Sequence, residues 1–138
     1  MIQLTDEMRE ALANALTDRL PVILAYVGPG GQPSISFRGT AQVYSDDQIA
    51  IWARNPEGGL GHALAVNPRI ALLYRNPEKR LGWQFHGRAR IVDDEAVRRT
   101  VYDNSPEPER GADPERKGKA MIVDVDRVIA RGQTLMER

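Results

Sequence analysis

The chain has 138 residues, 41% hydrophobic and 28% charged, which is enough for one ordinary globular domain over residues 1–138 and for no second one. Its 19 basic and 19 acidic residues give no net charge, which argues against nucleic acid or an anionic membrane surface as a partner. Because cysteine is absent, disulfides, thiolate metal sites and cysteine nucleophiles are excluded.

The chain opens with a predicted amphipathic helix. Thr5 is a suitable N-cap, acidic residues follow it in the first turn, and an i, i+3, i+4 apolar stripe runs from Met8 to Leu16. The helix is expected to end before Pro21. No basic region followed by an apolar one precedes it, and no apolar run approaches the roughly 18 residues of a membrane span. We therefore expect a cytoplasmic protein with no membrane partner.

After Pro21 the pattern changes to the two-residue period of β-strands. A strand over 22–27 leads through a glycine-rich turn at 28–31 into a long returning strand over 34–44. One face of this second strand is apolar, and the other carries Arg38, Thr40 and Gln42. From such alternation we expect a buried set comprising Ile35, Phe37, Val43, Ile49, Ile51, Leu72, Phe85 and Ile91.

The rest of the chain continues as short strands separated by turns and two helices. Strands are predicted over 48–54, 69–75, 82–92 and 119–125, a short helix over 60–66, and another helix after Asp93 and Asp94. The Pro-, Gly- and charge-rich segment 105–118 is interpreted as a surface excursion. Six strands with short connections predict a mainly β protein built as a closed or nearly closed antiparallel barrel, since closure removes exposed sheet edges.

Few residues in the chain suit metal or nucleophilic chemistry. The only histidines, His62 and His86, lack a second ligand at metal-binding spacing, so no metal site is predicted. No serine lies in a Gly-x-Ser-x-Gly elbow, and the paired aspartates fall where turns and helix caps account for them. We therefore assign no catalytic residue from the sequence.

A binding site is suggested around a glycine turn. Gly58, Gly59 and Gly61 flank Leu60 at the start of the predicted short helix, where backbone N–H groups can bind phosphate. Arg38 and Thr40 of the second strand, with Trp52 and Arg54 of the third, are predicted to lie nearby. Guanidinium groups, a hydroxyl and an indole beside such a turn suit a phosphorylated planar heterocycle.

The order of these motifs resembles the pyridoxamine 5'-phosphate oxidase-like, FMN-binding split β-barrel superfamily. The resemblance spans residues 5–126 and is carried by Gly-Gln-Pro-Ser-Ile-Ser-Phe-Arg-Gly-Thr, Ile-Ala-Ile-Trp-Ala-Arg, the glycine turn, the helix ending in Asn67-Pro68 and Gly-Trp-Gln-Phe-His-Gly-Arg-Ala. It implies a six-stranded antiparallel split barrel that works as a homodimer with the flavin at the dimer interface. By position, the implied cofactor-binding residues are Arg38, Gly39, Thr40, Trp52, Ala53, Arg54, Gly58, Gly59 and Leu60.

One position departs from the family pattern. Many members have a lysine seven residues before the Asn of Asn-Pro, and this chain has Leu60 there. Arg38 or Arg54 must then supply the positive charge for the phosphate. The chain also has Arg131-Gly132-Gln133 in place of the C-terminal Arg-x-His expected for pyridoxamine phosphate oxidation, so that substrate is not predicted.

The resemblance implies an FMN-dependent oxidoreductase acting on an unidentified small molecule. In such proteins the flavin accepts or donates the hydride, while the protein supplies binding and electrostatics. The alternative is a non-catalytic protein that binds or stores flavin, since the same cleft would serve both. Some relatives use the deazaflavin F420 or haem, and a haem here would have only His62 or His86 as a nitrogen ligand.

Overall fold

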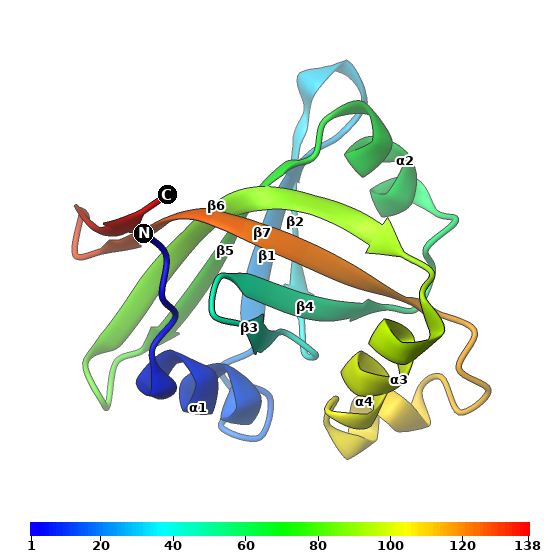
Figure 1. Cartoon of the computed structure of the whole chain (residues 1–138), viewed down its shortest axis with the longest axis horizontal. Helices are drawn as coiled ribbons and strands as arrows, with labels where there is room; N and C mark the ends of the chain where they lie inside the picture. The colour runs from blue at the N-terminus through cyan, green and yellow to red at the C-terminus, as the bar shows by residue number, and fades with distance from the viewer.

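The computed structural model describes residues 1–138 and shows one curled antiparallel sheet with short helices around it (Figure 1). The strand order is β2-β1-β5-β6-β7-β4-β3, with β8 added to β7. The strands are β1 (Val22–Val27), β2 (Pro33–Arg38), β3 (Gln42–Ser45), β4 (Gln48–Ala53), β5 (Arg69–Asn76), β6 (Leu81–Val92), β7 (Lys119–Ala130) and β8 (Gln133–Glu137). The α-helices are α1 (Asp6–Asn14), α2 (Gly59–Val66), α3 (Glu95–Asp103) and α4 (Glu107–Gly111).

The two edge strands of this sheet, β2 and β3, are consecutive in the chain. Only residues 39–41 separate them, so the opposite edges of the sheet must meet at one corner. The sheet therefore curls into a barrel that is open along the seam between β2 and the β3–β4 pair. This arrangement confirms the predicted mainly β, antiparallel split-barrel fold with short helices.

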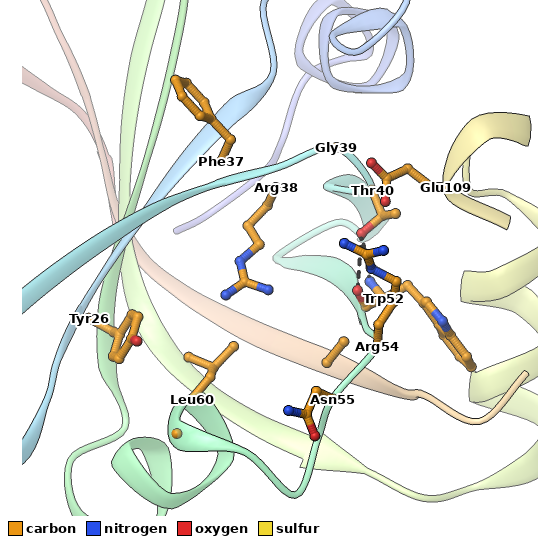
Figure 2. Close-up of a pocket in the computed structure, with 12 residues that line it drawn as sticks. Tyr26, Phe37, Arg38, Gly39, Thr40, Trp52, Arg54, Asn55, Leu60 and Glu109 are labelled. Carbon is orange, nitrogen blue, oxygen red and sulfur yellow. Dashed lines mark hydrogen bonds between the residues drawn. The ribbon is translucent and has the colours of Figure 1, made fainter. Parts of the chain in front are cut away.

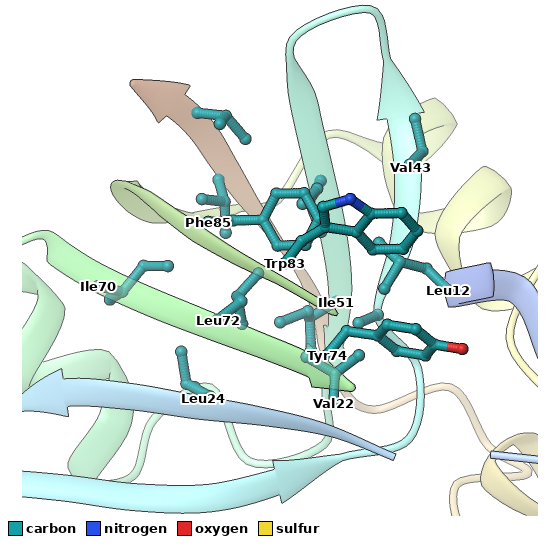
Figure 3. Close-up of a cluster of buried hydrophobic side chains, with 14 of the residues drawn as sticks. Leu12, Val22, Leu24, Val43, Ile51, Ile70, Leu72, Tyr74, Trp83 and Phe85 are labelled. Carbon is teal, nitrogen blue, oxygen red and sulfur yellow. The ribbon is translucent and has the colours of Figure 1, made fainter. Parts of the chain in front are cut away.

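The barrel interior is packed with apolar side chains (Figure 3). Leu24, Leu72, Phe85 and Ile51 are at most 1% exposed, and the Tyr74 ring stacks on Trp83 with centroids 5.6 Å apart. A second, smaller cluster lies on the outer face of β4 and β7, under α3. It consists of Ala50, Trp52, Val101, Tyr102, Ala120 and Ile122. Strand β4 is thus buried on both faces.

Two helices begin at the caps that their sequences indicate. Thr5 Oγ1 accepts a hydrogen bond from the Met8 N–H at 3.1 Å, and an Asp94 carboxylate oxygen accepts one from the Val97 N–H at 3.0 Å. Each cap satisfies an N–H group that has no partner inside its helix. None of the helices has both the length and the apolar character needed to cross a membrane.

The structure has eight strands where the sequence pattern predicts six. The predicted strand 34–44 is interrupted at residues 39–41, so β2 pairs with β1 while β3 pairs with β4. The last predicted strand continues to Ala130, and a tight turn at Arg131 and Gly132 adds β8. Both turn residues have positive φ, 52° and 75°, as a type I′ hairpin turn requires.

The predicted burial of Ile35 and Phe37 is wrong. Their side chains are 74% and 69% exposed, because β2 is an edge strand whose apolar face lies outside the barrel. That face continues through Ile23 of β1 to Leu73 of β5, which is also exposed. The other predicted core positions Val43, Ile49, Ile51, Leu72 and Phe85 are buried, and Ile91 is half-buried.

The 105–118 segment is more ordered than a simple surface excursion. It contains α4, and its residues Ser105 and Asp113 are 2% and 8% exposed. Tyr102 of α3 donates its hydroxyl to the Arg110 and Asp113 carbonyl oxygens at 3.1 and 3.0 Å. The segment therefore folds back against α3 and β4 instead of extending into solvent.

Candidate functional site

A pocket of about 410 Å³ lies at the seam of the barrel, between the ends of β2 and β4 and the N-terminus of α2 (Figure 2). Of the nine cofactor-binding residues predicted from sequence, all but Gly58 line it. These are Arg38, Gly39, Thr40, Trp52, Ala53, Arg54, Gly59 and Leu60. Gly58 is the N-cap of α2, next to Gly59. Residues from three separate stretches of sequence are thus brought to one cavity.

The positive groups of the pocket are Arg38, the last residue of β2, and Arg54, which directly follows β4. Arg38 Nε donates to Ser36 Oγ at 3.1 Å. Burial lowers the pKa of Arg38, and the nearby positive charge of Arg54 lowers it as well, against raising contributions from Tyr26 and Glu109. Neither arginine forms an ion pair, since all the salt bridges of the chain involve other residues. Two guanidinium groups are therefore available to an anion.

The N-terminus of α2 forms another side of the pocket. It begins at Gly59 with Gly58 as a cap that has no side-chain oxygen, so the first N–H groups of the helix keep their positive ends free. Gly61 is required by close packing, because a Cβ there would lie 2.0 Å from the Pro56 carbonyl oxygen. Leu60 is only 9% exposed, and its side chain belongs to the main core cluster. A helix end and two arginines thus surround the same space.

Other predicted polar contacts are used inside the protein. Thr40 is 4% exposed, and its hydroxyl oxygen accepts a hydrogen bond from the Trp52 N–H at 2.8 Å. Gln42 does not line the pocket; its amide donates to the carbonyl oxygens of Thr40 and Val101 at 3.1 and 3.2 Å. These bonds hold the β2–β3 connection against β4 and α3. They fix the position of the pocket wall.

The Trp52 indole is held by a buried carboxylate from the 105–118 segment. Trp52 Nε1 donates to Asp113 Oδ2 at 3.0 Å, and the Asp113 carboxylate also accepts from the N–H groups of Lys117 and Gly118 at 3.0 and 2.9 Å. Burial alone would raise the pKa of Asp113, but these hydrogen bonds and the Arg54 charge outweigh it and lower the pKa. Asp113 therefore remains charged at neutral pH.

Four pocket residues were not predicted from the sequence: Tyr26, Phe37, Asn55 and Glu109. Figure 2 shows Tyr26 beside Leu60 and Glu109 on the Gly39–Thr40 side of the cavity. Asn55 directly follows Arg54 in the predicted turn, so its place in the sequence could have identified it as a pocket residue. Tyr26 and Glu109 come from β1 and α4, which only the tertiary fold brings to the site.

The two histidines lie outside this pocket. His62 is exposed on α2, and His86 Nε2 is 2.5 Å from Gln84 Oε1 on the same strand. The structure contains no cluster of His, Cys, Asp or Glu that could hold a metal ion. The groups that can contact a ligand in this pocket are therefore two guanidinium groups, a helix N-terminus, a carboxylate and apolar side chains.

Comparison with known proteins gives one family match and several similar folds. The family model described as pyridoxamine 5'-phosphate oxidase matches residues 4–129. No protein of curated function matches the chain. Among solved structures, HupZ of Group A Streptococcus superposes with a TM-score of 0.72 at 22% identity, covering 97% of this chain and 97% of its own.

Two further structures show the same fold. A Clostridium acetobutylicum protein of the pyridoxinephosphate oxidase family, related to general stress protein 26 of B. subtilis, has a TM-score of 0.65 at 15% identity and covers 94% of this chain and 95% of its own. An F420 reductase has a TM-score of 0.61 at 19% identity, covering 80% of this chain and 89% of its own. At these identities the likeness shows a shared fold, the split barrel.

Proposed function

Because the chain belongs to the pyridoxamine 5'-phosphate oxidase family, we propose that its seam pocket binds FMN and that the protein is a flavin-dependent oxidoreductase acting on a small molecule. When bound, the flavin would supply the hydride chemistry, which needs no protein nucleophile. The observation that carries the proposal is the convergence of Arg38, Arg54 and the α2 N-terminus on one pocket, with both guanidinium groups free of ion pairs.

The residues of this pocket fit a phosphorylated flavin. A phosphate would bind between the two guanidinium groups and the first N–H groups of α2, where charge-assisted hydrogen bonds are strongest. Tyr26 and Leu60 offer apolar contacts, and Phe37 lies at the rim. Arg38 and Arg54 take the place of the lysine that many family members have at the position of Leu60.

The test compares FMN with riboflavin, which lacks the phosphate. Arg38→Ala or Arg54→Ala should weaken FMN binding by about 1.5 to 3 kcal/mol, the range for hydrogen bonds to charged groups, or roughly 10- to 150-fold in Kd. Riboflavin binding should change far less. Arg99→Ala is the matched control, because Arg99 is exposed on α3 and does not line the pocket. Fluorescence quenching titrations measure the Kd values of both ligands for the wild type and the three variants.

Equal losses for FMN and riboflavin would mean that the arginines hold the ring or the fold, and the phosphate assignment would be wrong. A spectrum of protein purified without added cofactor distinguishes flavin, F420 and haem. Steady consumption of reduced nicotinamide by the loaded protein would support an oxidoreductase, whereas tight binding without turnover would support the alternative of a binding or storage protein. The fold shared with an F420 reductase makes F420 the second cofactor to test.

We also propose that the protein is a homodimer. The outer face of β2, β1 and β5 presents Ile35, Phe37, Ile23 and Leu73 as one apolar strip. Phe37 belongs to both the strip and the pocket rim, so a second copy covering the strip would also enclose the pocket. Exposed apolar patches of this kind mark interaction sites.

The dimer proposal is tested by light scattering. Wild-type protein should have about twice the 15.4 kDa chain mass, and Phe37→Asp should give the chain mass, because a buried unpaired carboxylate is unfavourable at an interface. Glu78→Ala, an exposed change on the β5–β6 turn, is the control. A wild-type monomer at micromolar concentration would contradict the proposal.

A further inference from the structure

The pocket contains a carboxylate that the flavin proposal does not use. Glu109 of α4 lines the cavity together with Arg38 and Arg54, and its side chain forms no hydrogen bond or ion pair within the protein. Figure 2 shows the Glu109 carboxylate near Gly39 and Thr40, on the side of the cavity toward which the Arg54 side chain extends. A negative group thus shares the space in which we place a phosphate.

The position of Glu109 is fixed by the 105–118 segment. Tyr102 donates its hydroxyl to the carbonyl oxygen of Arg110, the next residue, at 3.1 Å. The Arg110 guanidinium in turn donates to the Ser105 carbonyl oxygen at 2.5 Å. Asp113 then binds the end of the segment to Trp52. Because the helix is held on both sides of Glu109, its carboxylate is directed to the pocket rather than left free in solvent.

Gly39 provides the room that Glu109 occupies. A Cβ at position 39 would lie 2.6 Å from Glu109 Oε1 and 3.1 Å from its Cδ. Position 39 is not among the glycines with positive φ, so its backbone does not itself demand glycine. Glycine is therefore needed at position 39 for steric reasons, because any larger side chain would displace the Glu109 carboxylate.

The charges act on one another across the cavity. Burial is the main reason that the pKa of Arg38 is lowered; the positive charge of Arg54 adds to this lowering, and the negative charge of Glu109 opposes it. With Glu109 ionised, the three groups carry a net charge of one positive unit instead of two. A phosphate placed between the arginines would therefore meet a reduced positive potential.

Resting on the proposed function, we propose that Glu109 sets the charge selectivity of the pocket. Its negative charge weakens the attraction for a phosphate dianion. The pocket therefore prefers phosphorylated over unphosphorylated ligands by a smaller factor than it would without this charge. A carboxylate and a ligand phosphate on opposite sides of a half-exposed cavity repel each other enough to weaken phosphate binding by about three- to tenfold. Glu109→Gln keeps the size and polarity of the side chain and removes only its charge. The ratio of the riboflavin Kd to the FMN Kd should then rise by about three- to tenfold.

The control is Glu107→Gln, which removes the same charge from the same helix at an exposed position outside the pocket. It should leave the ratio unchanged. Gly39→Ala supplies a second perturbation, because its Cβ displaces Glu109. It should raise the ratio in the wild type and raise it much less in the Glu109→Gln background, where no charge is displaced. Thermal melting of each variant shows whether the fold is kept.

Two failures can be told apart. If wild type prefers FMN to riboflavin and Glu109→Gln leaves the ratio unchanged, the role of Glu109 is wrong and the cofactor proposal stands. If wild type binds neither flavin, the cofactor proposal is wrong, and inorganic phosphate becomes the probe. Phosphate is titrated into wild type and Glu109→Gln while the Gly59 amide resonance is followed. Tighter phosphate binding by the variant supports the role of Glu109, and equal binding overturns it.

Discussion

Replacing Asp113 by alanine removes a buried carboxylate that accepts hydrogen bonds from the Trp52 indole and from the N–H groups of Lys117 and Gly118. The Trp52 and Gly118 donors are buried, so the alanine variant would leave them without partners. A buried donor without a partner costs about 1 to 3 kcal/mol. With two such donors, we expect Asp113→Ala to lower the free energy of unfolding by about 2 to 6 kcal/mol at neutral pH.

The pH dependence of this loss follows from the lowered pKa of Asp113 in the folded protein. A carboxyl whose pKa is lower folded than unfolded stabilises the fold fully above its unfolded value, about 3.9 for Asp, and loses this contribution as the pH falls through the folded value. The difference in unfolding free energy between wild type and Asp113→Ala should therefore be constant from pH 6 to 8. It should shrink below roughly pH 4.

Urea denaturation at several pH values measures both effects. In a Trp83→Phe background the remaining tryptophan is Trp52, whose fluorescence reports the hydrogen bond directly. Glu115→Ala is the control, since Glu115 forms only an exposed ion pair with Lys117 and should change stability by less than about 1 kcal/mol. Two results would refute the reasoning. One is an unfolding free energy of Asp113→Ala within about 0.5 kcal/mol of its parent protein at pH 7, which is the spread of neutral surface changes. The other is a difference between the two proteins that grows as the pH falls.

Two packing predictions complete the set, both measured by urea denaturation. Phe85→Ala should lower the free energy of unfolding by about 3 to 5 kcal/mol, because the ring is 0% exposed in the barrel core. The control Val66→Ala, at an 88% exposed position, should have almost no effect. Similar losses for both variants would show that the core is misassigned. Gly87→Ala should cost about 1 to 3 kcal/mol, because its Cβ would lie 2.4 Å from the Asp124 carbonyl oxygen at a β-bulge, and an unchanged midpoint would contradict this contact.

The elements that short-range chemistry determines were predictable from the sequence. Thr5 caps α1 as expected, and β1 has the predicted bounds of 22–27. Asp94 likewise begins α3 after β6. A helix cap, the alternation of apolar and polar residues along a strand and the end of an element each depend on residues within one turn or one strand. They can therefore be predicted without knowing the rest of the fold.

The side of the sheet on which a face lies could not be read from alternation alone. Ile35 and Phe37 alternate with polar residues as a core strand would, but the alternation only states that the two faces differ. Strand β2 is an edge of the sheet, and its apolar face is outside the barrel. Only the strand order reveals this, and that order depends on contacts far apart in the sequence.

The candidate site was predictable where polar residues share a strand face or flank a glycine turn. Arg38 stood out on the polar face of the second predicted strand, although that strand was expected to continue through Gly39. Arg54 and Gly59 stood out because they flank the turn into α2. Glu109 gave no such signal, because it is one of several charges in a segment rich in proline and glycine. Its role appears only when Tyr102 and Asp113 fold that segment onto the seam.

The net charge of the chain likewise does not indicate the charges at the pocket. The chain sums to zero, yet most of its ion pairs are formed on the surface by arginines and lysines distant from the pocket, such as Arg88 with Asp126 and Arg127 with Glu137. Charges that are paired and hydrated produce little field at a distance. Arg38 and Arg54 form no ion pair, so two guanidinium groups remain available at the seam although the whole molecule is neutral. What an anion meets there is set by these two side chains, by the α2 N-terminus and by Glu109, and a single charge change at position 109 acts on it more than any surface substitution.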